Sequence, residues 1–278
     1  MGIVNSIGRG LAALVLVVVI SAPAPALARD FGVDVSHHNG PSGVSQSAWN
    51  QMAAQGKTFA YIKASEGLTG PDDAAMASNV ARATSAGIRN GVYHYAHPEN
   101  RNTLTGAQAE ADHLLSYAGS AIAPGKLRPV LDLEDLASGL SQADLTTWAI
   151  NFSNRIIAVK GAAYEPLIYC NRSFARDELD SRIAGYDLWL ANYDTPNNPA
   201  SGEPPSAPGY EDPTGQFNNW MIWQYSETGT AGGVTPIDLN VFNNDDYSFN
   251  ALIIPEPGSM TLLASAAAVA AARRRRHA

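Results

Sequence analysis

Residues 128–135 read RPVLDLED, and the pattern of this stretch decides the fold that the rest of the chain must supply. As a strand, it places Val130, Asp132 and Glu134 on one face. Two residues along a strand span about 7 Å, a separation at which paired carboxyl groups act as acid and base on a glycosidic bond. We therefore take this pair as the candidate centre of the site.

An Asp-x-Glu tripeptide alone is a weak signal, because it is usually a solvated edge or a chance pair. Here the opposite face consists of Leu131 and Leu133, as expected of a strand covered by helices. The acidic face is then expected to point into the interior or the mouth of a barrel.

Seven further segments have the composition or alternation of strands. They are residues 31–36, 58–65, 90–96, 166–171, 187–193, 221–226 and 237–242. Helical patterns follow the earlier strands, at residues 45–55, 72–86, 105–117 and 141–160, with a short one at 173–179. Residues 194–219 are rich in Pro, Gly, Asn and Ser and predict a long loop. We predict an α/β fold: an irregular, parallel TIM-like (β/α) barrel of eight strands, with helices missing between the last strands.

The same alternation places further polar side chains inside this barrel. Asp34 in the first strand and Asp238 in the last strand face inward, as does Lys63 in the second strand. An inward lysine is costly unless carboxylates lie nearby. Because catalytic groups of such barrels come from the ends of several strands, we expect Asp34, Asp132, Glu134 and Asp238 to converge.

Both ends of the 278-residue chain have the features of targeting signals. Residues 1–28 combine Arg9, an apolar run and an Ala-Leu-Ala site, typical of a secretory signal peptide, so we expect an exported protein. Residues 255–278 contain Pro-Glu-Pro, an Ala-rich apolar stretch and four arginines, and resemble a PEP-CTERM sorting signal. That resemblance implies an exosortase-type sorting enzyme as partner and transient anchoring in the membrane of the cell envelope by a C-terminal transmembrane helix. The domain between them is residues 29–254.

The charge of this domain limits its partners. It carries 13 Lys and Arg against 25 Asp and Glu, a net charge of −12, which disfavours nucleic acid and anionic lipid. Cys170, the only cysteine, is expected to be a buried small hydrophobe. His94 has no second His or Cys at ligand spacing, so we expect a structural histidine and no metal site. We expect a monomer.

Eight motifs in order make residues 31–243 resemble glycoside hydrolase family 25, the Chalaropsis-type lysozymes (N-acetylmuramidases). They are GVDVSHHNG (32–40), AYIKASEG (60–67), GVYHYA (91–96), PVLDLED (129–135), IYCN (168–171), LWLANY (188–193), WQYS (223–226) and DLNVF (238–242). The family fold is an eight-stranded barrel whose last strands lack helices. The resemblance implies cleavage of the β-1,4 bond between N-acetylmuramic acid and N-acetylglucosamine in peptidoglycan glycan strands, with no metal or cofactor.

The resemblance also implies roles for individual residues. Glu134 is the general acid, Asp132 stands beside it, and Asp34 and Asp238 line the sugar site. Residues expected to contact substrate are Lys63, Tyr93, Tyr169, Trp189 and Trp223, although simple core packing is an equal alternative for each aromatic. A chitinase is less favoured, because its D-x-D-x-E motif needs an acid at Val130. A non-catalytic glycan-binding protein of the surface or matrix on the same barrel is the remaining alternative.

Overall fold

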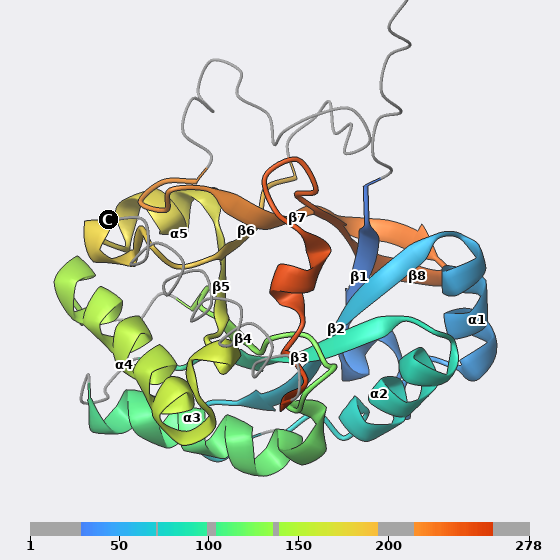
Figure 1. Cartoon of the computed structure of the whole chain (residues 1–278), viewed down its shortest axis with the longest axis horizontal. Helices are drawn as coiled ribbons and strands as arrows, with labels where there is room; N and C mark the ends of the chain where they lie inside the picture. The colour runs from blue at the N-terminus through green and yellow to red at the C-terminus, as the bar shows by residue number, and fades with distance from the viewer. Residues whose placement is uncertain (1–28, 71, 99–103, 136–138, 194–213, 258–278) are drawn as a thin grey trace, which may run out of the picture.

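The computed structural model describes residues 29–70, 72–98, 104–135, 139–193 and 214–257 (Figure 1). The expected signal peptide, residues 258–278 of the expected sorting signal and most of the predicted loop at 194–219 lie outside the described residues. Within the described part, no helix has the length and apolar character needed to cross a membrane.

Eight strands form one closed barrel in chain order, so the predicted architecture is confirmed. They are β1 (Phe31–Val35), β2 (Lys57–Glu66), β3 (Arg89–Tyr95), β4 (Val130–Asp132), β5 (Leu167–Asn171), β6 (Leu188–Ala191), β7 (Trp220–Ala231) and β8 (Val234–Phe242). From β1 to β7 each neighbour is parallel.

The last strand departs from the predicted parallel barrel. β8 runs antiparallel to both β7 and β1. Two residues separate β7 from β8, and a connection this short joins antiparallel strands, because a parallel pair needs a crossover of a dozen or more residues. The absence of a helix between the last two strands therefore sets the direction of β8.

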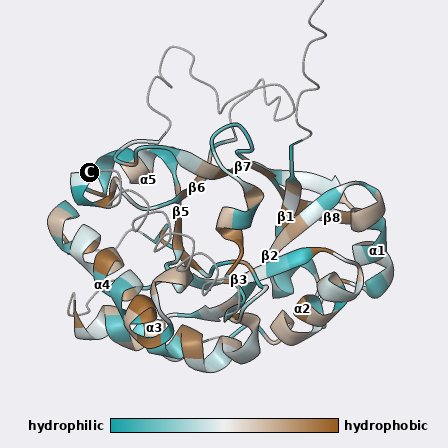
Figure 2. Cartoon of the chain, viewed as in Figure 1, coloured by the Kyte–Doolittle hydropathy of each residue, from teal (hydrophilic) through white to brown (hydrophobic). Residues whose placement is uncertain are grey.

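Helices cover the outside of the earlier strands, as Figure 1 shows. They are α1 (Gln46–Ala54), α2 (Met76–Ser85), α3 (Thr105–Ala118), α4 (Gln142–Lys160) and α5 (Arg172–Asp177). Ser45 and Ser141 cap α1 and α4 by accepting hydrogen bonds from Ala48 N and Asp144 N, which satisfies otherwise unpaired helix donors. Brown and teal segments alternate along α3 and α4 in Figure 2, as expected of helices with one apolar face.

The alternation of β4 separates two apolar cores. Leu131 and Leu133 belong to the outer core between barrel and helices, whereas Val130 belongs to the core inside the barrel. The predicted strand at 128–135 is longer than the observed one, so Glu134 lies two residues beyond the end of β4. Gly32 lies beside the inner core, where an added Cβ would come within 2.4 Å of the Phe59 ring.

The chain after β8 closes one end of the barrel. In Figure 1 the red segment near the C-terminus crosses the barrel in front of the strands. Its residue Leu252 is fully buried in the inner core, and Phe249 packs against the same core. The opposite end, toward which the parallel strands β1 to β7 run, stays open.

Candidate active site

Two adjoining hollows occupy the open end of the barrel and share five residues. The deeper hollow has a volume of about 210 Å³ and the outer one about 340 Å³. The shared residues are Tyr93, Asp132, Glu134, Glu227 and Asp238. We call the two hollows together the groove. Asp34 lines the deeper hollow, so the four acids predicted from the sequence lie in one place.

Asp34 is the most fully hydrogen-bonded of these acids. Its Oδ2 accepts hydrogen bonds from Gln224 Nε2 and Asn240 Nδ2, both at 2.8 Å. The side chain of Asp238 is also hydrogen-bonded to Asp34. Burial, the Asp34 charge and this hydrogen bond raise the pKa of Asp238 to about 9. Asp238 therefore carries a proton at neutral pH and donates it to the Asp34 carboxylate.

Asp132 and Glu134 form a second coupled pair. Burial, and then the neighbouring Glu134 charge, raises the pKa of Asp132 well above its usual range. Burial and the Asp34 charge also raise the pKa of Glu134, although its side chain is exposed at the rim of the groove. Each of these carboxyl groups therefore retains its proton to higher pH than an isolated acid.

Asp132 has an unsatisfied oxygen in this pair. Asp132 is 6% exposed, and its Oδ1 is buried without a hydrogen-bond partner in the protein. Buried polar atoms are rarely left unpaired, so this oxygen is an acceptor available to a group that enters the groove.

Lys63 lies inside the barrel, as predicted, and the expected carboxylates are present. Its Nζ donates a 2.6 Å hydrogen bond to Glu66 Oε2 and lies 4.8 Å from the centre of the Tyr95 ring. The Lys63 charge also opposes the upward pKa shifts of Asp132 and Glu134. One cation thus partly compensates the acidic groove.

Three of the four predicted aromatic contacts lie at the groove. Tyr93, Tyr169 and Trp189 line the deeper hollow, and Trp189 also donates a 2.8 Å hydrogen bond from Nε1 to Asn240 Oδ1. The prediction that Trp223 lines the groove is wrong. It is fully buried in the outer core and donates to the carbonyl of Asn192, so it faces away from the groove.

Sequence reasoning missed Gln224, Tyr193 and Glu227. Tyr169 Oη and Tyr193 Oη both donate to Gln224 Oε1, which turns the amide nitrogen of Gln224 toward Asp34. Glu227, on β7, lines both hollows. Gln224 alternates with Trp223 along β7, so the choice of Trp223 as a groove residue excluded Gln224 from the same face.

His94 is a buried structural histidine, as predicted. Its Nδ1 is 2.8 Å from Ser65 Oγ and its Nε2 is 3.0 Å from Glu110 Oε2, outside the barrel wall. Cys170 is buried, and burial raises the pKa of its thiol. No cluster of three or more His, Cys, Asp or Glu suited to a metal ion occurs in the described ranges.

The barrel and its groove define a class of protein. Coupled carboxyl groups with raised pKa values, lined by aromatic rings at the carboxyl ends of barrel strands, are the arrangement of a glycosidase.

Comparison with known proteins gives the family. Residues 33–234 match the model of Glycosyl hydrolases family 25, and the chain belongs to this family. It is 34% identical over 231 residues to "Lysozyme M1" of Streptomyces globisporus, an alignment that covers 80% of this chain and 70% of that protein. It is 36% identical over 127 residues to "N,O-diacetylmuramidase" of Chalaropsis sp, covering 43% of this chain and 57% of that protein. The crystal structure of the bacterial lysozyme from Streptomyces coelicolor superimposes with a TM-score of 0.64 at 30% identity, covering 82% of this chain and 96% of that chain.

Proposed function

We propose that this glycosidase is an exported lysozyme that hydrolyses the β-1,4 bond between N-acetylmuramic acid and N-acetylglucosamine in bacterial peptidoglycan. The observation that carries the proposal is the convergence of Asp34, Asp132, Glu134 and Asp238 in one groove. The names of the relatives support the same substrate.

Glu134 acts as the general acid in this proposal. It stands at the rim of the groove, and its raised pKa lets it keep a proton for the leaving glycosidic oxygen to higher pH than a free carboxyl group does. Asp132 stands beside it, and its unpaired Oδ1 accepts the N–H of a substrate acetamido group. Asp34, with the protonated Asp238, lines the sugar site opposite, and the rings of Tyr93, Tyr169 and Trp189 face the sugars.

The ends of the chain extend the proposal to location. Residues 1–28 direct export, and residues 255–278 serve as a sorting signal for an exosortase-type enzyme, with transient anchoring in the membrane. Residues 29–254 act on the glycan strands as a monomer without a cofactor.

Glu134→Gln tests the proposal, because the amide keeps the shape of the side chain but supplies no acidic proton. We expect wild-type protein to clear a suspension of purified peptidoglycan and the variant to clear it about 10²- to 10⁴-fold more slowly. Glu165→Gln, at the opposite end of the barrel beside Arg128, is the control and should clear normally. Equal clearing by Glu134→Gln would remove Glu134 from its role.

The bond cleaved is tested on the products. Reducing-end analysis of the released muropeptides should find muramic acid at the new reducing terminus. Glucosamine at that position would identify the other glycosidic bond. Binding to peptidoglycan without any new reducing ends would favour a non-catalytic glycan-binding protein.

A further inference from the structure

Four residues beside the groove form a connected chain of charges that the catalytic proposal does not use. They are Lys63, Glu66, His97 and Asp135, and we call them the His97 bridge. Glu66 Oε2 accepts the hydrogen bond of Lys63, and its other oxygen, Oε1, is 2.8 Å from His97 Nε2. The second ring nitrogen, His97 Nδ1, is 2.9 Å from Asp135 Oδ2. The imidazole therefore has a carboxylate on each side.

The positions of these residues give the bridge its importance. Glu66 is the last residue of β2, His97 follows β3 by two residues, and Asp135 follows β4 by three. The ring thus connects the carboxyl ends of three successive strands. One end of the bridge holds Lys63, which lines the groove, and the other end holds the residue next to Glu134.

The geometry specifies the protonation of the ring. A neutral imidazole has one N–H, so one of its nitrogens would direct a lone pair at a carboxylate. Glu66 is ionised: although burial opposes it, the hydrogen bonds and charges of Lys63 and His97 lower the pKa of Glu66. Two carboxylate acceptors favour a ring in which both nitrogens donate, and the bridge then contains two cations and two anions.

The surroundings hold the ring in this orientation. The backbone N of His97 donates a 3.1 Å hydrogen bond to Glu110 Oε2 of α3, and the Tyr95 ring of β3 lies 5.2 Å away, edge to face. The carboxylate of Glu110 also holds His94. A Cβ added at Gly67 would come within 2.9 Å of His97 Cδ2, so the loop after β2 packs directly on the ring.

We propose that His97, in its doubly protonated form, is a positioning residue that fixes Lys63 and Glu134 relative to each other across the groove. Loss of one ring proton removes the His97 hydrogen bond from Glu66 Oε1 or from Asp135 Oδ2 and leaves the two carboxylates facing one cation fewer. The segment that carries Glu134 is then no longer connected to β2. As pH rises, kcat therefore falls at a lower pH than that at which the protein unfolds. This proposal rests on the proposed hydrolysis for its kinetic consequence alone.

Kinetics on soluble muropeptide strands across the neutral and alkaline range test the role. His97→Asn should lower kcat by about 10- to 100-fold with little change in KM, because displacing a catalytic acid by about 1 Å reduces the rate by a factor of this size. His97→Arg, a permanent cation with forked donors, should restore most of kcat and move the alkaline decline to higher pH. Wild-type kcat in His97→Asn, or no rescue by arginine over asparagine, would overturn the proposal.

His113→Gln is the matched control. Its two ring nitrogens also have two partners, Gly67 O at 2.7 Å and Asp72 Oδ1 at 2.9 Å, but neither partner lines the groove. This variant should keep the wild-type pH profile. A profile displaced as far as that of His97→Asn would show that any paired histidine on this side has the same effect, and would also overturn the proposal.

Nitrogen NMR of the histidine rings in the wild-type protein separates this proposal from the proposed function. At neutral pH the His97 ring should show two protonated nitrogens, and one of these protons should be lost over the pH range in which kcat falls. A singly protonated ring at neutral pH overturns the bridge, whether or not the protein cleaves peptidoglycan. Absence of hydrolysis with a doubly protonated ring would instead count against the proposed function and with it the catalytic role of the bridge.

Discussion

At the scale of single residues, the groove is built from acids whose protons are distributed by their neighbours. Asp34 receives donors from Gln224, Asn240 and Asp238, whereas Asp132 keeps an unpaired oxygen. Burial raises the pKa of both groups, but only at Asp34 do side-chain hydrogen bonds oppose this rise. In the proposed reaction, Asp34 and Asp238 line the sugar site and Glu134 releases the proton.

Asp238 should make the stability of the protein depend on pH. Its pKa is about 9 when folded and 3.8 ordinarily, so between these values the folded state binds the proton and the unfolded state does not. The contribution of Asp238 to the free energy of unfolding is therefore fully present below the lower pKa. It is lost as pH rises toward the upper pKa, by up to about 1.4 kcal/mol per pH unit. Asp238→Asn retains a donor for Asp34 without titrating.

Denaturant unfolding across this pH window checks the expectation. The wild-type free energy of unfolding should fall with pH more steeply than that of Asp238→Asn. The exposed Asp112→Asn, which only loses an ion pair with Arg155, should keep the wild-type slope. Parallel slopes for Asp238→Asn and the wild type would mean that Asp238 is ionised at neutral pH.

The inward and outward faces of most strands could be predicted from residues such as Asp34 and Leu131, because one face is polar at the barrel mouth and the other is apolar. β7 defeats this logic. Its residues Met221, Ile222 and Trp223 are all apolar, because the strand lies between two apolar cores. The alternation of polar and apolar residues therefore could not indicate which of them face the inside of the barrel. The side-chain partners of Gln224 come from β1, β5 and the chain after β6, and no local sequence pattern predicts them.

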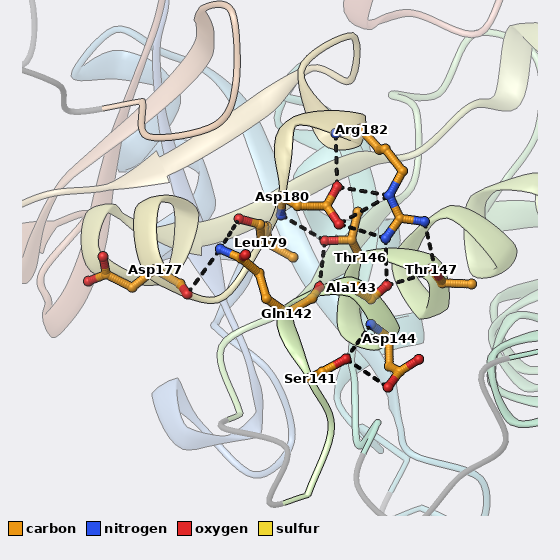
Figure 3. Close-up of polar contacts among 10 residues, drawn as sticks. All are labelled: Ser141, Gln142, Ala143, Asp144, Thr146, Thr147, Asp177, Leu179, Asp180 and Arg182. Atoms are coloured by element: carbon orange, nitrogen blue, oxygen red, sulfur yellow. Dashed lines mark hydrogen bonds and ion pairs between the residues drawn. The ribbon is translucent and has the colours of Figure 1, made fainter.

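At the scale of elements, the first turns of α4 are attached to the segment after α5, as Figure 3 shows. Thr146 Oγ1 donates to Gln142 O and accepts a 2.9 Å hydrogen bond from Asp180 N, and Gln142 Nε2 donates to Leu179 O. Arg182 adds hydrogen bonds to Ala143 O and Thr147 Oγ1. The sequence predicted both elements but not this attachment, since it joins residues more than thirty positions apart.

Thr146→Val should cost about 1–2 kcal/mol of stability, because Thr146 is fully buried and its loss leaves the Asp180 N–H without an acceptor. Arg182→Ala should change stability far less, because its guanidinium is exposed and its bonds exchange with water. Thermal and denaturant unfolding of the two variants give the comparison. If Arg182→Ala is the more damaging, the surface network and not the buried hydroxyl holds the two elements together.

At the scale of the whole molecule, the barrel has one open end and one closed end. The closing segment lies beyond residue 234, where the match to the family model ends. It forms a short ladder in which Arg128 N donates to Leu252 O at 2.7 Å and Ile254 N donates to Lys126 O at 2.8 Å. Arg128 begins the stretch that leads to Asp132, so the closed end supports the strand that carries the acids.

The protein without its first 28 residues serves as the reference. Ending this chain at residue 257 should leave its unfolding temperature unchanged, whereas ending it at residue 242 should prevent folding. Leu252→Ala provides the graded test, because removal of a fully buried leucine costs about 2–5 kcal/mol. Leu252→Ile, which conserves volume, is the matched control and should cost less than about 1.5 kcal/mol. Calorimetry of these five proteins checks the expected values. Cooperative unfolding of a stable chain ending at residue 242 would show that the barrel forms without the closing segment. The support of β4 would then come from β3 and β5 alone.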